Sequence, residues 1–401
     1  MTGPSTLNRA ARLLALITPR ASADAVLRRE LSPRRDLPPG ERRDIAHAVA
    51  AYFRWRRWLD EREPPQRQLE AALAWQRRFA AAPDAFKPET LAARAVPDWI
   101  AAAMDTVPVD WLRHLQREPV LWIRARKKFV AALPRTLGDL APAQVTGLVE
   151  SGPGSEPPAT TAFRYTGPHD LFLTPAFQEG QFEIQDLASQ LVGHACAPRP
   201  GETWWDTCAG EGGKTLHLAD LMDNQGLIWA SDRSARRLSL LKQRAARAQV
   251  FNYRAVSWDG GPRPPTKTRF DGVLIDAPCS GVGTWHRHPD ARWTTSPADV
   301  YELAAIQRQL LDHAAGSLKP GGRLVYAVCT LTRAETTAVA DGFAAAHPEF
   351  KPAAVFPRVP SESLEASREA QIPGLRTPTS VTLWPNEIHA NGMFIAAWWK
   401  R

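Results

Sequence analysis

The sequence of 401 residues contains only four cysteines, and none of them form the paired CxxC spacing of a zinc site. A small disulfide scaffold needs more cysteine, so this count excludes one and indicates a reducing compartment. The sequence also lacks an apolar run long enough to cross a membrane. Its first apolar stretch, Leu13 to Thr18, is too short for a signal peptide and has no small-residue cleavage site. We expect a cytoplasmic protein with no metal site and no membrane contact.

What the sequence does contain is typical of a globular protein, with 44% hydrophobic and 23% charged residues. Its length exceeds that of one ordinary core and predicts two or three domains. Lys and Arg outnumber Asp and Glu, which gives a formal net charge of +8. This excess suits a polyanionic partner, because basic side chains that neutralise phosphates release counterions.

The first quarter of the chain has a helical pattern. From Leu7 to Met104 apolar residues recur at helix spacing, and proline-containing turns separate the segments. The basic residues are all arginine until Lys87, with acidic residues interspersed. This pattern fits either a solvated helical surface or an RNA-binding face. We assign residues 1–115 to a helical domain.

The second half of the chain alternates strand and helix signals. The strand-like runs are Thr203–Thr207, Leu227–Ser231, Asn252–Val256, Gly272–Asp276 and Leu324–Cys329. The helical stretches are Lys214–Met222, Arg236–Ala248 and Asp299–Leu318. The alternation predicts a mostly parallel sheet with helices on both faces. We place this α/β domain at residues 181–401, and a small linking subdomain, which opens with the strand-like run Val120–Ala125, at residues 116–180.

A glycine-rich loop follows the first of these strands. It reads Cys208-Ala209-Gly210-Glu211-Gly212-Gly213-Lys214 and opens a helix, so its backbone N–H groups can approach a ligand. Asp232 follows the second strand, at the position from which a carboxylate usually binds ribose hydroxyls. The pattern predicts a nucleotide-like cofactor, although a purely structural turn has similar spacing. It differs from the GxxxxGK[ST] phosphate loop, which argues against an NTPase.

Two cysteine motifs end later strands. Asp276-Ala277-Pro278-Cys279-Ser280-Gly281 follows the fourth strand, and Cys329-Thr330 ends the fifth. Because α/β sheets bind ligands at the carboxyl ends of their strands, both cysteines should face one cleft. A lone cysteine at a strand end is more often an inert core residue, but two beside a cofactor loop favour a functional role.

At these residues the sequence resembles the RsmB/Fmu/Sun family of S-adenosylmethionine-dependent RNA cytosine-5 methyltransferases. The Asp-Ala-Pro-Cys-Ser-Gly run, the Cys-Thr pair and the Gly-Gly-Lys-Thr loop follow the family's order, and the similarity extends from Glu183 to Phe394. The N-terminal helices, around Trp55–Asp60, resemble the NusB-like domain of the bacterial rRNA enzymes. One departure stands in the loop, where Gly210 and Glu211 replace the family's usual Ala-Pro.

The resemblance implies a Rossmann-like class I methyltransferase domain that methylates carbon 5 of a cytosine in RNA. It identifies Cys329 as the nucleophile that attacks carbon 6 and Cys279 as the base that completes the reaction. Asp276 would bind the target base and contact the cofactor, and Lys214 would lower the pKa of the attacking thiol. The implied cofactor-binding residues are Cys208, Ala209, Gly210, Glu211, Gly212, Gly213, Lys214, Asp232, Asp259 and Asp276.

Some assignments stay open at this point. Asp259 is expected near the adenine, with an ordinary turn residue as the alternative. Arg287 and Arg292 are expected either to position the RNA strand or to support the motif loop, and Trp293 to be mainly structural. The target base should be single-stranded or flipped, because it must enter a closed pocket. We expect a monomer that acts on rRNA; a tRNA substrate and a non-catalytic RNA-binding assembly factor are the alternatives, and both cysteines with Asp276 argue against the latter.

Overall fold

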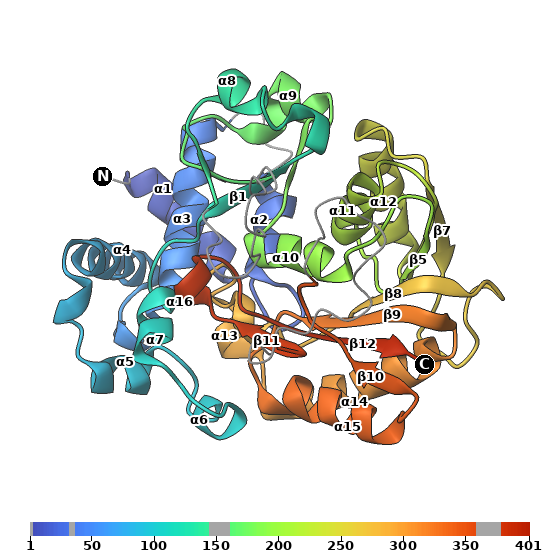
Figure 1. The fold of residues 1–401 in the computed structure, drawn as a ribbon. Helices are drawn as coiled ribbons and strands as arrows, with labels where there is room; N and C mark the ends of the chain where they lie inside the picture. Colours follow the sequence, from blue (N-terminus) through green and yellow to red (C-terminus); the bar gives the residue numbers. More distant parts are fainter. Residues whose placement is uncertain (1–2, 32–36, 144–160, 358–377) are drawn as a thin grey trace.

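The computed structural model describes residues 3–31, 37–143, 161–357 and 378–401. Along the chain it has N-terminal helices, then a small antiparallel sheet, then a larger and mostly parallel sheet (Figure 1). The predicted fold class, helices followed by an α/β part with a mostly parallel sheet, is confirmed. Residues 144–160, within the range predicted for the linking subdomain, lie outside the described residues.

The N-terminal helices are α1 (Pro4–Leu14), α2 (Ala23–Leu31), α3 (Pro39–Trp55), α4 (Pro65–Ala81), α5 (Pro88–Arg94), α6 (Ile100–Ala103) and α7 (Val109–Leu115). Proline opens α1, α3, α4 and α5, where its missing N–H costs no intrahelical hydrogen bond. The core between these helices is rich in aromatic side chains. The buried Trp55 ring lies 5.5 Å from Phe86 and 5.6 Å from Phe79, measured between centroids.

This core continues into a later part of the chain. Val282 and Trp285, which follow the first cysteine motif, are buried in the same apolar cluster as the N-terminal helices. The Trp285 ring stacks on Trp111 at a centroid distance of 6.5 Å and meets Trp99 edge-on at 6.0 Å. Ring pairs of this kind add about 0.5–1.5 kcal/mol each beyond the burial of their area. The helices therefore pack directly against the segment that follows Cys279.

A small antiparallel sheet follows the helices along the chain. Its strand order is β2-β3-β1-β4, and it buries Ile123, Phe163 and Phe182 on one side. Its elements are β1 (Leu121–Ala125), β2 (Leu140–Pro142), β3 (Ala162–Tyr165) and β4 (Phe182–Ile184), with the short helices α8 (Leu133–Leu137) and α9 (Pro175–Gln178). Strand β1 coincides with the apolar run that predicts a strand there.

The larger sheet has the strand order β10-β12-β9-β8-β5-β6-β7, with β11 paired to β12. Its strands are β5 (Thr203–Asp206), β6 (Leu227–Asp232), β7 (Tyr253–Ser257), β8 (Phe270–Asp276), β9 (Leu318–Val328), β10 (Phe350–Pro352), β11 (Ser380–Leu383) and β12 (Met393–Lys400). Strands β5 to β9 are parallel and overlap the predicted runs, although β9 begins six residues before its run, and β12 lies antiparallel to β9. The sequence pattern does not predict β10, β11 or β12.

Helices cover both faces of this sheet, as predicted. In the view of Figure 1, α10, α11 and α12 lie above the strands, and α14 and α15 lie below them. Their bounds, with the two short helices α13 and α16, are α10 (Leu187–Cys196), α11 (Gly213–Leu221), α12 (Ala235–Arg247), α13 (Ala291–Thr294), α14 (Pro297–Ala315), α15 (Thr337–Ala346) and α16 (Pro385–Ile388). The helix predicted to reach Leu318 ends at Ala315, because Leu318 already pairs with Phe270 in the sheet.

The order of the strands decides where a ligand can bind. Strand β5 lies between β6 and β8, so the direction in which the chain adds strands reverses beside β5. In open α/β sheets the crevice at such a reversal, at the carboxyl ends of the strands, is the usual ligand site. The glycine-rich loop follows β5 and the first cysteine motif follows β8, so the sheet places both at this position. Among the described helices, none has both the length and the apolar content that a bilayer span requires.

Candidate active site

The glycine-rich loop turns sharply between β5 and α11. Gly210 and Gly212 have φ values of 56° and 86°, in the left-handed region that favours glycine. A Cβ at Gly212 would lie 2.7 Å from the Leu241 side chain, so α12 also excludes a larger residue there. At Gly210 and Gly213 a Cβ would meet no atom of the described residues within 4 Å. The described residues therefore leave room for a ligand beside the backbone at these two positions.

Asp232 ties the end of β6 to this loop. Its carboxylate is buried, and Oδ2 accepts a hydrogen bond from the Gly210 N–H at 3.0 Å, while Oδ1 accepts one from Ser234 N–H at 2.7 Å. Asp259, unlike Asp232, is exposed. Its Oδ1 accepts a hydrogen bond from Gly261 N–H at 2.9 Å. That contact is the turn arrangement which the sequence leaves as the alternative for Asp259.

Lys214 and Asp276 form an ion pair at the centre of the site. The Lys214 Nζ donates to Asp276 Oδ2 at 2.7 Å, which joins the first turn of α11 to the carboxyl end of β8. Burial by itself would lower the pKa of Lys214, but the charge and hydrogen bond of Asp276 outweigh it and raise that pKa. The ammonium group therefore stays charged at neutral pH.

The two motif cysteines lie side by side. The Sγ atoms of Cys279 and Cys329 are 3.2 Å apart, because β8 and β9 are parallel neighbours and both motifs follow their carboxyl ends. The hydrogen bond from Cys279 lowers the pKa of Cys329, and Lys214 acts in the same direction. The same hydrogen bond, together with burial, raises the pKa of Cys279. The pair therefore favours one thiolate, on Cys329, and one thiol, on Cys279.

A model of the 16S rRNA methyltransferase RsmB/F family matches residues 194–399, which include the loop, the ion pair and both cysteines. The chain belongs to this family. It is 37% identical over 227 residues to a probable ribosomal RNA small subunit methyltransferase B of Synechocystis sp., a match that covers 55% of this chain and 48% of that protein. It is 40% identical over 181 residues to the Bacillus subtilis protein of the same name, a match that covers 45% of this chain and 40% of that protein. The chain thus spans about half the length of these curated relatives, or less.

Solved structures resemble the RsmB/F chain over more of its length. The protein PH0851 is 23% identical and superposes with a TM-score of 0.74 over 99% of both chains, which shows a common fold. A methyltransferase homologue of Pyrococcus horikoshii is 26% identical, with a TM-score of 0.59 over 76% of this chain and 94% of the other. The resemblance drawn from the motifs is therefore confirmed at the level of family and fold.

Two buried carboxylates near the site of this RsmB/F family member are not predicted from the sequence. Asp206, the last residue of β5, is fully buried, and burial raises its pKa to about 7. Its Oδ2 accepts from the Thr215 hydroxyl at 2.6 Å, so it holds the start of α11 from beneath. Its place directly before the glycine-rich loop is a signal that the sequence does contain. Glu335, beneath the cysteine motifs, is the other, and no local pattern marks it.

Cys208, by contrast, does not present a reactive thiol. Burial raises its pKa to about 12, and its side chain packs against the core on the α14 side of the sheet. Its position in the loop is therefore compatible with backbone contacts to a ligand, and its side chain fills the space beneath the turn.

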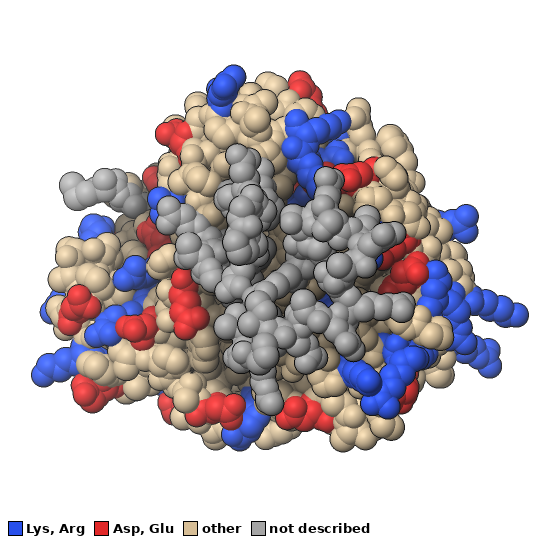
Figure 2. Space-filling view, in the orientation of Figure 1, with Lys and Arg blue, Asp and Glu red and all other residues tan. Residues whose placement is uncertain are grey.

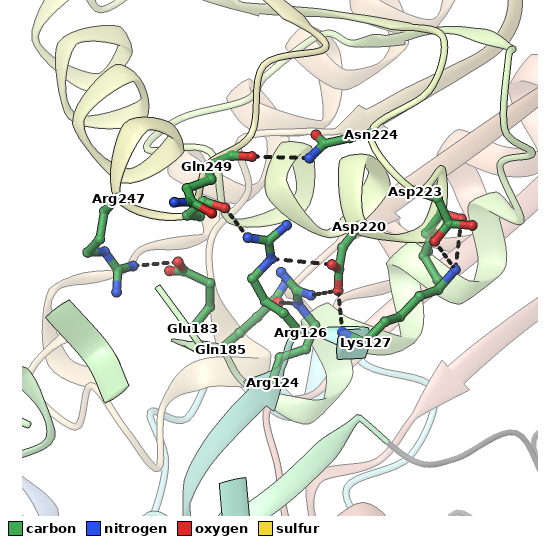
Figure 3. A network of polar contacts seen from close by, with 12 residues as sticks. Arg124, Arg126, Lys127, Glu183, Gln185, Asp220, Asp223, Asn224, Arg247 and Gln249 are labelled. Atoms are coloured by element: carbon green, nitrogen blue, oxygen red, sulfur yellow. Dashed lines mark hydrogen bonds and ion pairs between the residues drawn. The ribbon is translucent and has the colours of Figure 1, made fainter. Parts of the chain in front are cut away.

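A buried polar network joins residues of the small sheet to α11 and α12 (Figure 3). Glu183 of β4 is almost fully buried and pairs with Arg247 and, at 2.8 Å, with Arg244, both from α12. Arg244 also donates to the Glu211 carbonyl oxygen at 3.1 Å. The small sheet is thereby connected through α12 to the middle of the glycine-rich loop.

A second branch of the network reaches the other end of the loop. The buried Arg124 of β1 donates to Gln185 Oε1 at 2.7 Å and to Asp220 Oδ2 at 2.9 Å. Gln185 in turn donates to the Gly213 carbonyl oxygen at 3.3 Å. Gly210 and Glu211 replace a more rigid Ala-Pro pair in this loop, so these contacts supply restraint that the loop sequence itself does not.

Arg292 supports the motif segment and does not face solvent. It is fully buried, and its guanidinium donates to the carbonyl oxygens of Ala95 and Leu115 at 3.0 Å each. Trp293 donates from its indole to the Phe53 carbonyl oxygen at 2.6 Å. Of the two roles left open for Arg292, the structure favours the structural one, since its guanidinium also donates to the Trp285 carbonyl oxygen at 3.2 Å and so joins the motif segment to the N-terminal helices.

Proposed function

We propose that the protein transfers a methyl group from S-adenosylmethionine to carbon 5 of a cytosine in RNA, and that this RNA is rRNA. The observation that carries this proposal is the pair of cysteines 3.2 Å apart, with the ion pair of Lys214 and Asp276 between them and the glycine-rich loop. The relatives from Synechocystis sp. and Bacillus subtilis are both named probable ribosomal RNA small subunit methyltransferase B, which supports a ribosomal substrate.

The residues around the loop fit this cofactor. No atom of the described residues would lie within 4 Å of a Cβ at Gly210 or Gly213, so the backbone there can approach a ligand closely. Asp232 ends β6 where ribose hydroxyls are usually bound, and Asp206 Oδ1 has no hydrogen-bond partner among the described residues. The remaining proposed contacts are Cys208, Ala209, Glu211, Gly212, Lys214, Asp259 and Asp276. When bound, S-adenosylmethionine supplies an electrophilic methyl group.

The cysteine pair supplies what the base lacks. Carbon 5 of cytosine is a poor nucleophile, and addition of the Cys329 thiolate to carbon 6 makes it an enamine-like carbon that can accept the methyl group. Asp276 hydrogen-bonds the ring nitrogen or the amino group of the base, and it thereby favours the protonated ring to which the thiolate adds. Lys214 keeps a positive charge beside the reacting groups.

Cys279 then removes the proton from carbon 5, and the bond between carbon 6 and Cys329 breaks. The thiol of Cys279 is protonated in the free enzyme chiefly because it donates to the neighbouring sulfur. Once Cys329 is bonded to carbon, its negative charge is gone, the pKa of Cys279 falls, and Cys279 releases its proton to solvent before it acts as the base. Cys279 therefore becomes a base after Cys329 has bonded to carbon 6, which is the step at which the carbon-5 proton must be removed.

The test separates the two cysteines. Cys279→Ala should form the covalent adduct with RNA but fail to release it, and a slow-migrating band that depends on added cofactor should appear on a denaturing gel. Cys329→Ala and the double variant should show no such band, while Cys196→Ala, which changes a buried core cysteine, should turn over normally. A band that appears with Cys329→Ala and vanishes with Cys279→Ala would exchange the two roles.

The substrate proposal extends to the whole chain: residues 1–115 as a NusB-like RNA-binding domain, 116–180 as the linking subdomain and 181–401 as the catalytic domain of a monomer. Lys and Arg also group at the edge of the molecule formed by β7 and the loop after it (Figure 2). That loop carries Arg263, Lys267 and Arg269, all exposed. Bisulfite sequencing of RNA from cells with and without the gene distinguishes rRNA from tRNA, and a complete lack of change would indicate a non-catalytic protein.

A further inference from the structure

Glu335 is a fully buried carboxylate that joins the two cysteine motifs. It ends the short turn Arg333–Glu335, which follows β9. Its Oε1 accepts from Ser280 N–H at 2.8 Å, and its Oε2 accepts from the hydroxyls of Ser280 and, at 3.1 Å, Thr330. Ser280 directly follows Cys279 and Thr330 directly follows Cys329, so one carboxylate binds the neighbour of each cysteine.

The rest of its surroundings fix this carboxylate in place. Gln307 of α14 donates both to Glu335 Oε1 at 3.0 Å and to the Pro278 carbonyl oxygen at 2.9 Å. Thr332 donates to Oε2 at 2.8 Å, and the Tyr326 hydroxyl donates to the Glu335 carbonyl oxygen at 2.6 Å. A strand, a helix and both motif loops thus contact a single residue, the strand through its main-chain carbonyl oxygen and the others through its carboxylate.

We propose that Glu335 is a positioning residue of the cysteine pair: it fixes the separation of Cys279 and Cys329, and its negative charge restrains the pair to a single thiolate. The inference rests on the proposed function for the use to which the pair is put, but the pair's geometry and ionisation can be measured without RNA or cofactor. The carboxylate takes no direct part in the reaction under this proposal, because both of its oxygens already accept hydrogen bonds from the motif loops.

The electrostatic part follows from the charges that face the two sulfurs. Lys214 favours the Cys329 thiolate, whereas Asp276 and Glu335 both oppose it. Glu335 also contributes to the raised pKa of Cys279, and the phenol of Tyr326 lies behind it. Removing the charge of Glu335 should therefore lower the pKa of both thiols, so that each thiolate appears at a lower pH.

Geometry and charge can be separated, because the donors to the two oxygens differ in kind. Both described donors to Oε1, from Ser280 and Gln307, are N–H groups, whereas those to Oε2 are hydroxyls. In Glu335→Gln the amide oxygen can take the place of Oε1, and the hydroxyls can rotate to accept from the amide nitrogen. The amide nitrogen has two N–H groups for the three hydroxyls, so that variant removes the charge and keeps all but one of the contacts. Glu335→Ala removes both and leaves buried donors unpaired.

The experiment measures alkylation of the cysteines by iodoacetamide as a function of pH, resolved by mass spectrometry of the two peptides. In Glu335→Gln the midpoint for Cys329 should move down by about one pH unit, the usual size for loss of a nearby like charge. Asp341→Asn, which neutralises an exposed acid on α15, should leave the profile unchanged. An identical profile in Glu335→Gln and the parent would overturn the charge part of the proposal.

Turnover tests the positioning part. Glu335→Gln should keep activity with its pH profile shifted down, whereas Glu335→Ala should lose at least tenfold in kcat with little change in KM for S-adenosylmethionine. Where Glu335→Ala does not fold, the double variant Ser280→Ala and Thr330→Val removes two of the hydroxyl contacts and should show the same split. Parental kcat in either would overturn positioning. If the protein had no methyltransferase activity at all, the alkylation shift would still decide the ionisation part by itself.

Discussion

Neutralising Asp220 should destabilise the protein by about 3 kcal/mol, the lower end of the cost of leaving a buried charge without its partner. Asp220 lies in α11 and is 8% exposed. Its Oδ2 accepts from Arg124 at 2.9 Å and from the Lys127 N–H at 3.3 Å, and its Oδ1 accepts from Arg126 at 3.3 Å. Asp220→Asn keeps one acceptor oxygen but presents an N–H group to a donor, and it removes the carboxylate with which two buried guanidinium groups pair (Figure 3).

The matched control lies three residues further on. Asp223 pairs with the Lys127 ammonium at 2.8 Å, and these two side chains are 51% and 45% exposed. An exposed pair of this kind contributes about 0–1 kcal/mol, since water screens it and two flexible side chains must be ordered. Asp223 has a φ of 54°, which asparagine also tolerates, so Asp223→Asn changes the charge without straining the backbone.

Urea unfolding of both variants gives the comparison, from the shift in midpoint at an unchanged slope. Added salt should weaken the effect of Asp223→Asn and leave that of Asp220→Asn nearly unchanged, because buried pairs are screened less. If Asp220→Asn lowered the free energy of unfolding by no more than Asp223→Asn does, the charges of the network would make no net contribution to stability. The restraint that the network places on the glycine-rich loop would then have to come from packing.

Two further outcomes concern the ligands. Asp232→Ala should weaken S-adenosylmethionine binding by about 1–3 kcal/mol, the cost of an unmade buried hydrogen bond, while Asp259→Ala should have a smaller effect; calorimetry showing an unchanged Kd for Asp232→Ala would place the ribose contact elsewhere. Arg28 and Arg29 on α2 are exposed, and their replacement by Glu should lower RNA affinity and flatten its dependence on salt. An unchanged salt slope would make the N-terminal helices a scaffold.

The parts of the site that sequence predicts are those set by local order. A strand, a glycine-rich turn and a helix occur consecutively, and the rule that ligands bind at strand carboxyl ends then brings Lys214 next to Asp276 across 62 residues. The cysteine pair follows from the same rule, because β8 and β9 are parallel neighbours. Asp232 is predictable as the end of the next strand, although its hydrogen bond to Gly210 is not.

The parts that sequence does not predict depend on long-range packing. Arg292 appears in the chain as an ordinary basic residue of a motif, and only the fold shows that it donates to a carbonyl 197 residues away. Glu335 likewise stands in a polar stretch with no periodicity. Strand β12 is a short apolar run with no neighbour indicated by its pattern, so its antiparallel pairing with β9 is visible only in the sheet.

The packing of Trp285 against the N-terminal helices also bears on the order of folding during synthesis. The helices end at Leu115, but the apolar surface around Trp111 is completed only when Trp285 has been made. At about 5–20 residues per second the ribosome needs roughly 10–30 s for the intervening stretch. During that interval the nascent helices must carry an uncovered aromatic face. The growing chain therefore passes through a stage in which this aromatic face is accessible to chaperones, and the face is covered only when Trp285 packs against Trp111.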